Sequence, residues 1–228
     1  MSNSDPKASA LTARILYEAG GLLVIDKPPG LPTSGRTLED ADSLQYELMQ
    51  HFGGMVWAVH QLDADTSGIN VFVREKRLVP HWQRRMRYPN GTKTYLAIVH
   101  GVVEFEQRRV DAAIGVVTDE PTRQLGLVAD GKRAVSEVRV LARGANASLL
   151  EVRIETGRTH QIRIHLASLG HPLIGEDWYR EPKCEVHPRQ ALHAWRLEFA
   201  DEEEPRRLEC PLPHDIVELM TSLGLELG

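Results

Sequence analysis

The sequence predicts an α+β fold in which a mixed, mainly antiparallel β-sheet is flanked by helices and loops. The segments expected to form strands outnumber those expected to form helices, and the two kinds do not alternate regularly, as they would in a doubly wound parallel sheet. Residues 135–141 and 149–155 alternate apolar with polar side chains, a pattern typical of neighbouring antiparallel strands. A chain of 228 residues can bury one core, so residues 14–228 are expected to form a single domain after a flexible leader, residues 1–13.

The first part of the chain is expected to open with a strand pair, residues 15–26, which turns at Gly20 and Gly21. Residues 27–32 are expected to form a stiff loop, because the prolines in this stretch cannot donate the hydrogen bonds of a central strand. Residues 44–52 place apolar side chains at every fourth position, which predicts a helix.

The middle of the chain is expected to carry two more strands and two more helices. The strands are expected at residues 69–73 and 93–99. A helix over residues 80–87 carries a basic cluster and ends at a Tyr-Pro-Asn-Gly turn signal. The last predicted helix covers residues 159–169 and ends before Gly170, a residue suited to the left-handed position that follows many helices.

Charge is distributed unevenly along the chain. The net charge of −5 argues against a protein that coats nucleic acid indiscriminately. Residues 74–100 carry seven Lys and Arg against one acid, whereas residues 201–228 carry eight acids against two arginines. A basic stretch beside an acidic tail indicates a local surface for a polyanion, although two solvated faces of opposite charge would fit the same counts.

The composition also indicates where the protein works. No apolar run approaches the roughly 18 residues of a membrane span, and the N-terminal residues lack the apolar core of a secretory signal. The two cysteines, Cys184 and Cys210, are too few for a disulfide framework and form no Cys-x-x-Cys metal motif. The expectation is a cytoplasmic protein in a reducing environment.

Asp63 lies in a short polar segment between two apolar runs, residues 55–59 and 69–73. A carboxylate in this place is costly unless something pairs with it, which makes Asp63 a candidate reagent. Asp65 follows two residues later, and such a pair could share a magnesium ion while one carboxylate attacks a phosphoryl group. This arrangement resembles the first motif of haloacid dehalogenase-type phosphatases, but the sequence does not show clearly the downstream lysine and acidic motif that those enzymes need.

A second polar constellation occupies residues 155–166, where arginines and hydrogen-bonding side chains are interspersed with apolar residues. If a helix begins at Thr159, Arg163 lies one turn further along the same face. The turn before it, at Thr156 and Gly157, exposes backbone N–H groups, and helix N-termini attract anions. The alternative is a solvent-facing helix whose charges are incidental.

Three histidines, His160, His165 and His171, could in principle form a metal site. His160 and His165 are five residues apart, which places them about 140° apart around a helix and on opposite faces of a strand. Neither arrangement converges on one ion and no cysteine is close in sequence, so no metal is expected.

The motifs of this chain resemble those of the RluA family of RNA pseudouridine synthases. The segment around Asp63 reads His60-Gln61-Leu62-Asp63-x-x-Thr66-Ser67-Gly68 and is similar to the family's His-Arg-Leu-Asp-x-x-Thr-Ser-Gly motif. The other blocks in the family's order are Lys27-Pro28-Pro29-Gly30, Lys93-Thr94-Tyr95-Leu96-Ala97 with Gly101, residues 156–165 with 170–175, and His193-Ala194 with Pro211-Leu212-Pro213. Ordered blocks over roughly residues 15 to 215 make the resemblance specific.

The resemblance implies an isomerase that converts uridine in RNA into pseudouridine, on a pseudouridine synthase fold with an active-site cleft across the sheet. It implies no cofactor and no metal, because the reaction involves no net oxidation or hydrolysis. Asp63 matches the family's essential aspartate, which acts as nucleophile or base toward the ribose and uracil. Tyr95 matches the tyrosine that stacks on the target base. Arg163 matches the basic residue that pairs with the aspartate and would keep it ionised.

The target uridine must leave its stack to reach Asp63, so residues that grip RNA are expected around it. The candidates for RNA contact are Lys27, Gln61, Arg84, Arg85, Arg158, His160 and Gln161. The expected partner is ribosomal or transfer RNA, bound by a monomer that has no separate N-terminal RNA-binding domain. Gln61 stands where the family usually has an arginine, which leaves open a homologue that binds RNA but has lost catalysis.

Overall fold

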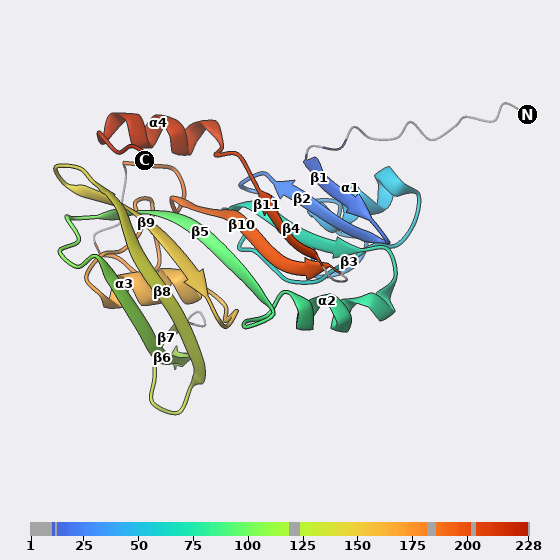
Figure 1. The fold of residues 1–228 in the computed structure, drawn as a ribbon, viewed down its shortest axis with the longest axis horizontal. Helices are drawn as coiled ribbons and strands as arrows, with labels where there is room; N and C mark the ends of the chain where they lie inside the picture. The colour runs from blue at the N-terminus through green and yellow to red at the C-terminus, as the bar shows by residue number, and fades with distance from the viewer. Residues whose placement is uncertain (1–10, 12, 119–123, 182–185, 202–203, 228) are drawn as a thin grey trace, which may run out of the picture. The chain divides into compact units, whose positions relative to one another are not determined.

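The computed structural model describes residues 11, 13–118, 124–181, 186–201 and 204–227 (Figure 1). The expected leader, residues 1–13, lies almost entirely outside the described residues. The chain forms two compact units, Met1–Gln83 and Arg84–Gly228. The expectation of one domain over residues 14–228 stays a prediction. Within the described part of the chain, no helix is long and apolar enough to cross a membrane.

The first unit is a small antiparallel sheet with one helix. Its elements are β1 (Arg14–Ala19), β2 (Leu22–Lys27), α1 (Leu44–Phe52), β3 (Trp57–Ala58), β4 (Ser67–Val73) and a short 3₁₀ turn (Lys76–Leu78). The strand order is β1-β2-β4, and β3 pairs with β4. The predicted strand pair with a turn at Gly20 and Gly21 is confirmed, and both glycines have positive φ, which favours glycine. The predicted helix over residues 44–52 is confirmed with the same bounds.

The core of the first unit lies where α1 packs on the sheet. Leu44 and Leu48 of α1 and Leu23, Ile25 and Phe72 of the strands have no exposed surface. The apolar side of the helix therefore faces the sheet, as predicted from the apolar residues at every fourth position. At the end of this strand pair, Lys27 of β2 lies opposite Gly68 of β4, and the candidate site residues of this unit lie beside these two positions.

The second unit contains a larger antiparallel sheet. Its elements are β5 (Gly91–His100), β6 (Gln107–Thr118), β7 (Gln124–Leu127), β8 (Lys132–Arg143), β9 (Ala147–Ile154), α3 (Gln161–Ser168), β10 (Leu192–Asp201), β11 (Glu204–Glu209) and α4 (His214–Ser222). The strand order is β11-β10-β5-β9-β8-β6-β7, and each of these neighbours runs antiparallel. Helix α2 (Val79–Arg85) crosses the boundary between the two units and covers most of the helix predicted over residues 80–87.

Helices cover both faces of the larger sheet. Gln161 and His165 of α3 bond to Ser136 of β8, and α3 is seen behind β8 and β9 in Figure 1. Helix α4 packs on the other face, where its Ile216 and Leu219 join a buried cluster with Leu96 of β5. Because neighbouring residues of a strand point to opposite faces, Tyr95 lies on the face that α3 covers.

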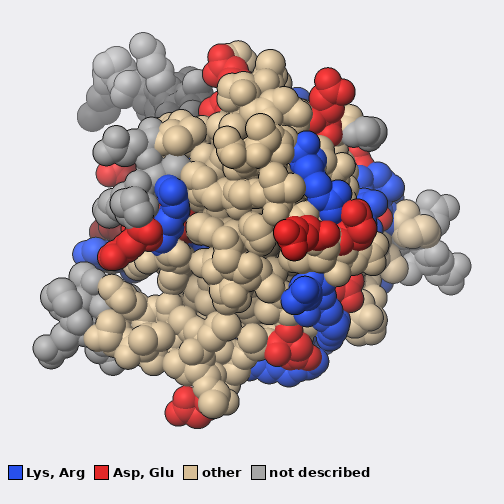
Figure 2. Space-filling view, turned by 90° about the vertical axis from the view of Figure 1, so that its left-hand side faces the viewer, with Lys and Arg blue, Asp and Glu red and all other residues tan. Residues whose placement is uncertain are grey.

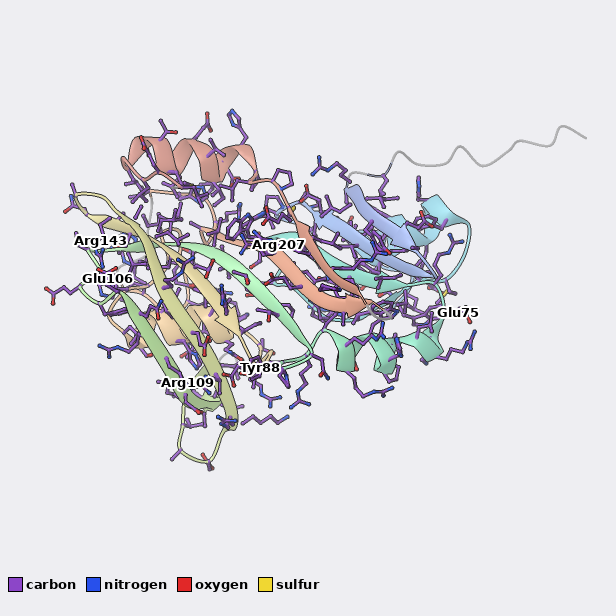
Figure 3. All side chains as sticks on the ribbon, viewed as in Figure 1. Glu75, Tyr88, Glu106, Arg109, Arg143 and Arg207 are labelled. Carbon is purple, nitrogen blue, oxygen red and sulfur yellow. The ribbon has the colours of Figure 1, made fainter. Side chains whose placement is uncertain are left out.

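Several charged side chains of the second unit pair with opposite charges on neighbouring segments. Figure 2 shows basic and acidic side chains next to one another at the margins of a broad uncharged band. Arg143 and Glu106, labelled in Figure 3, lie 2.7 Å apart. The nearly buried Glu151 lies within 3.2 Å of both Arg139 and Arg153. Many arginines of the second unit are therefore engaged by carboxylates.

Candidate active site

Asp63 begins a tight turn directly before β4. The N–H of Thr66 donates to the backbone oxygen of Asp63 at 3.0 Å, which closes the turn over residues 63–66. Asp63 is half-buried, whereas Asp65 at the tip of the turn is exposed. The two carboxylates therefore sit in different surroundings, and Asp65 has the position of an ordinary turn residue.

The side chain of Lys27 donates hydrogen bonds to this turn and to the proline-rich loop. Its ammonium group donates to the backbone oxygens of Pro28 at 2.9 Å, Leu31 at 2.7 Å and Ala64 at 2.6 Å. The side chain has no exposed surface. The burial of the ammonium group places it away from solvent, and the RNA contact expected of Lys27 stays a prediction. Its role is to join the proline-rich loop to the turn that carries Asp63.

Thr33 secures the other side of Asp63. Its hydroxyl accepts a hydrogen bond from the N–H of Leu62 at 2.9 Å and donates to Asn70 Oδ1 at 2.8 Å. The chain is thus held one residue before Asp63 by Thr33 and one residue after it by Lys27. A reactive side chain needs such support to keep a fixed geometry. The sequence did not single out Thr33 or Asn70, although buried polar residues beside a motif are a usable signal.

Gln61 is exposed, two residues before Asp63. Its side-chain oxygen accepts a hydrogen bond from the Ser34 hydroxyl at 3.2 Å. An exposed amide in this position can bond to the edge of a base, and the RNA contact expected of Gln61 stays a prediction.

Tyr95 occupies the middle of β5, where it pairs in register with Val152 of β9 and Ala194 of β10. Only 6% of its surface is exposed. Lys93 lies two residues earlier on the same face of the strand, and burial lowers the pKa of its ammonium group. Lys93 belongs to the motif around Tyr95, but the sequence analysis did not select it as a site residue.

Arg163 forms a buried ion pair with Glu176. Its guanidinium group donates from Nε at 2.9 Å and from one terminal nitrogen at 2.7 Å to the two carboxylate oxygens. Arg163 is 6% exposed and Glu176 has no exposed surface. Burial alone would raise the pKa of the Glu176 carboxyl, but the hydrogen bonds and charge of Arg163, helped by the backbone N–H of Trp178, hold that pKa below its ordinary value.

Glu176 is a residue that sequence reasoning missed. Arg163 was expected to pair with Asp63, and the structure places a carboxylate partner 13 positions downstream of the arginine. The pairing of Asp63 with Arg163 stays a prediction. A Glu between Gly175 and Asp177 carries no sequence signal for a buried partner, because exposed acids have the same local pattern.

His160 has a left-handed backbone with φ of 55°, which is uncommon outside glycine. Its Nδ1 lies 2.7 Å from the hydroxyl of Tyr179. The helix predicted over residues 159–169 therefore begins only at Gln161, since His160 leaves the helical region. The predicted end is confirmed, because Gly170 follows with φ of 83°. The RNA contact expected of His160 stays a prediction.

Gln161 is 3% exposed and all of its described bonds are internal. It donates to Val135 O and Ser136 Oγ, and it accepts from the Thr156 hydroxyl at 2.7 Å and from Arg158 N at 3.1 Å. The expected RNA contact of Gln161 stays a prediction. Its buried amide shapes the turn before α3.

The arginines expected to contact RNA are on the surface or near it. Arg158 is exposed, and its Nε donates to Arg133 O at 3.1 Å. Arg84 is exposed and Arg85 half-buried, both in the last turn of α2. Their positions are compatible with phosphate contacts, which stay predictions.

The three histidines considered as metal ligands have different surroundings. In the described part of the chain, no group of three or more His, Cys, Asp or Glu side chains is arranged to hold a metal ion. His165 is fully buried, and its Nδ1 lies 2.9 Å from Ser136 Oγ. Burial lowers the pKa of this imidazole, so His165 belongs to the packing between α3 and β8.

The overall match to known proteins agrees with this arrangement. The family described as RNA pseudouridylate synthase matches residues 21–168. Among solved structures, the human RNA pseudouridylate synthase domain containing 1 matches with a TM-score of 0.75 and 25% identity, over 97% of this chain and 98% of that one. The predicted α+β architecture, with its mainly antiparallel sheet and pseudouridine synthase fold, is confirmed.

Two sequence relatives extend the match over most of the chain. The ribosomal large subunit pseudouridine synthase D of Nitrosomonas europaea is 35% identical over 237 aligned positions, covering 97% of this chain and 68% of that protein. The dual-specificity RNA pseudouridine synthase RluA of Haemophilus influenzae is 36% identical, over 80% of this chain and 84% of that protein. The chain therefore belongs to the RluA family of RNA pseudouridine synthases.

Proposed function

We propose that this enzyme converts a specific uridine of ribosomal or transfer RNA into pseudouridine, with Asp63 as the group that acts on the target nucleotide. The observation that carries the proposal is that buried side chains hold the backbone on both sides of Asp63. Lys27 bonds to the residue after Asp63, and Thr33 bonds to the residue before it. A loop that only connects two strands does not need a buried lysine and a buried threonine to hold its two sides. The same support suits a carboxylate that must keep its position during a reaction.

The proposed reaction is an isomerisation that balances without a second substrate. The bond between N1 of uracil and C1′ of ribose breaks, the uracil turns while it is held, and C5 bonds to C1′. C5 then loses a proton and N1 gains one, so no electron acceptor, water or metal ion is consumed. Asp63 acts either as nucleophile at the nucleotide or as base, and both roles require the ionised carboxylate.

Tyr95 and Arg163 are the other proposed catalytic residues. The ring of Tyr95 stacks on the target base and helps to remove the C5 proton. Arg163 supplies the positive charge that pairs with the Asp63 carboxylate. Its bonds to Glu176 fix the guanidinium group in one orientation, which supports a role that depends on direction as well as on charge.

The RNA is proposed to be ribosomal or transfer RNA, held by contacts that include Gln61, Arg84, Arg85, Arg158 and His160. The name of the Nitrosomonas relative refers to the large ribosomal subunit, which makes ribosomal RNA the first substrate to test. Mapping pseudouridines in ribosomal and transfer RNA from cells with and without the gene identifies the target. A site that disappears in the deletion strain and returns when the gene is restored is the expected result.

Release of tritium from RNA labelled at C5 of uridine tests the proposed chemistry. The wild-type protein is expected to release tritium in the presence of EDTA, whereas Asp63→Asn binds RNA with an unchanged fold and releases none. Asp65→Asn is the matched control and retains activity, because Asp65 is exposed at the tip of the turn. Full activity of Asp63→Asn would refute the role of this residue. RNA binding by the wild type without release from any RNA pool would identify a binding protein, and loss of release with EDTA would favour a metal-dependent enzyme.

A further inference from the structure

Trp178 is an exposed aromatic side chain next to the Arg163–Glu176 ion pair. Its residue surface is 60% exposed, although tryptophan is costly to leave in water. Its backbone N–H donates to a carboxylate oxygen of Glu176 at 2.9 Å. The carboxylate that orients Arg163 therefore also positions Trp178.

The indole ring is surrounded on one side by polar and aromatic groups. The ring of His160 is nearly perpendicular to it, with centroids 5.3 Å apart and an interplanar angle of 87°. The guanidinium carbon of Arg163 lies 5.9 Å from the indole centroid, within the range of a cation–π contact. These contacts restrict the ring while a large part of the residue remains open to solvent.

His160 is held in its place by a second aromatic residue. Its left-handed backbone is unfavourable for a residue other than glycine, so the surroundings must favour it. The bond from Nδ1 to the Tyr179 hydroxyl, at 2.7 Å, is one such contact. Backbone strain of this kind concentrates at functional sites, and here it accompanies a ring contact between His160 and Trp178.

We propose that Trp178 is a stacking platform for an RNA base that neighbours the isomerised uridine. The inference rests on the proposed function, because it takes Arg163 to act on the target nucleotide. RNA is read mainly through unstacked bases, which stack on exposed aromatic rings regardless of their identity. A base beside the target occupies the free side of the indole when the target is next to Arg163. Trp178 then stabilises the opened strand that the chemistry requires.

Fluorescence measures this contact directly. The chain has four tryptophans, and Trp82 is 7% exposed while Trp57 and Trp195 are half-buried. A mixed-sequence single-stranded RNA of about twelve nucleotides is expected to quench the wild-type emission on binding. The quenching is expected to disappear in Trp178→Phe, which keeps an aromatic ring and the fold. Quenching of equal size in Trp178→Phe would overturn the proposal.

Affinity gives a second readout. Trp178→Ala is expected to weaken binding of the same RNA by about 5- to 150-fold, the range measured for loss of one base–aromatic stack. Trp178→Phe should lose much less. Tyr88→Ala is the matched control, since Tyr88 is 53% exposed in the loop between α2 and β5 and should leave affinity unchanged (Figure 3). Equal affinities of Trp178→Ala and wild type would refute the platform.

The tritium assay separates this inference from the proposed function. Trp178→Ala should raise KM while kcat changes little, because stacking holds RNA and takes no part in the bond changes. Asp63→Asn should still show the quenching while it releases no tritium. If Asp63→Asn is fully active, the proposed chemistry fails and the stacking result stands on the fluorescence. If Trp178→Ala has the KM and affinity of the wild type, the platform fails and the isomerase stands.

Discussion

The carboxylate partner of Arg163 is Glu176, which the local sequence around either residue does not predict. Two hydrogen bonds from one guanidinium group to Glu176 set both the position and the plane of the arginine. A lysine in this place would keep the charge but not the plane. At the scale of the residue, the ion pair therefore acts as a positioning device for the arginine proposed to support Asp63.

Glu176→Gln is expected to lower both stability and activity. The variant leaves a guanidinium group that is 6% exposed without its counter-charge, which should reduce the free energy of unfolding by about 3–5 kcal/mol. Glu106→Gln breaks the ion pair with Arg143 at a carboxylate side chain that is 77% exposed, and should cost less than about 1 kcal/mol. Urea unfolding at pH 7, followed by tryptophan fluorescence, measures the loss of unfolding free energy in each of the two variants. Similar losses in the two variants would contradict this account.

The pH dependence distinguishes a lost charge pair from a general packing defect. The pKa of Glu176 is lowered from its ordinary value of 4.5, so its contribution to stability is present above that pH and is lost as the pH falls further. The difference in unfolding free energy between wild type and Glu176→Gln should therefore shrink below about pH 4.5. A difference that stays constant down to the acid transition would indicate packing alone.

Lys27 shows why residue type alone misleads at this scale. A lysine at the start of a polar loop is a plausible phosphate ligand. The ammonium group of Lys27 is nevertheless buried and donates to three backbone oxygens. Gln161 is similar, because its amide is used internally. The motifs identified residues that matter to the site, but only three-dimensional contacts separate those that could touch RNA from those that hold the loops.

At the scale of elements, the segment after α3 approaches the loop before β10 very closely. Gly175 has φ of 78°, and a Cβ added there would lie 1.8 Å from the backbone oxygen of Arg189. The neighbouring Ile174 bonds through its backbone to Ile98 and to Ala191. This close packing places Glu176, the next residue, where it can meet Arg163.

Gly175→Ala is expected to destabilise the protein by at least about 3 kcal/mol, because both the backbone conformation and the space forbid a Cβ. Gly170→Ala is the matched control. Gly170 also has positive φ, at 83°, but nothing lies within 4 Å of an added Cβ, so only the conformational cost of about 1–2 kcal/mol applies. Thermal unfolding ranks the two variants. An equal loss in both would show that the contact with Arg189 is not what requires glycine.

Elements with clear periodicity or turn signals were predicted well. Helix α1 has the predicted bounds, and β8 and β9 pair antiparallel as their alternation indicated. The sequence did not reveal β6, β7, β10, β11 or α4 in advance. In β6 an alternation of charged and apolar residues is mixed with small residues, and its partners are set by the register with β8 and β7. Helix α4 begins after Pro213 without a side-chain cap, so its start carries no capping signal.

At the scale of the whole molecule, the site is less predictable than the fold. Ordered motifs led to Asp63, Tyr95 and Arg163 because these residues share a pattern with a known family. The supporting residues Thr33 and Glu176 depend on contacts 29 and 13 positions away along the chain, and a single sequence does not display such pairs. Long-range partners of this kind are found only when the strands are in place.

The charge pattern of the whole molecule limits how it binds RNA. The net charge of −5 repels a polyanion, and many described arginines already pair with carboxylates, among them Arg109, Arg133, Arg139, Arg143, Arg153 and Arg196. Lys27 is buried. Of the cations predicted from the sequence to contact RNA, Arg84, Arg85 and Arg158 are the three that lie at or near the surface. Affinity should depend on stacking and base contacts more than on bulk electrostatics.

Affinity for RNA is accordingly expected to fall only slowly with salt. Three phosphate contacts give a slope of log K against log salt of about −2 to −3, since each contact releases somewhat less than one counterion. Fluorescence anisotropy with a labelled RNA measures the slope over a roughly eightfold range of KCl concentration, from about 50 to about 400 mM. Replacing Arg84 and Arg158 by Gln should bring the slope close to −1, whereas Arg207→Gln should not change it, because Arg207 is paired with Glu209 (Figure 3). A wild-type slope steeper than about −6 would mean that the paired arginines open to bind RNA, and would contradict a recognition based on a few cations and on stacking.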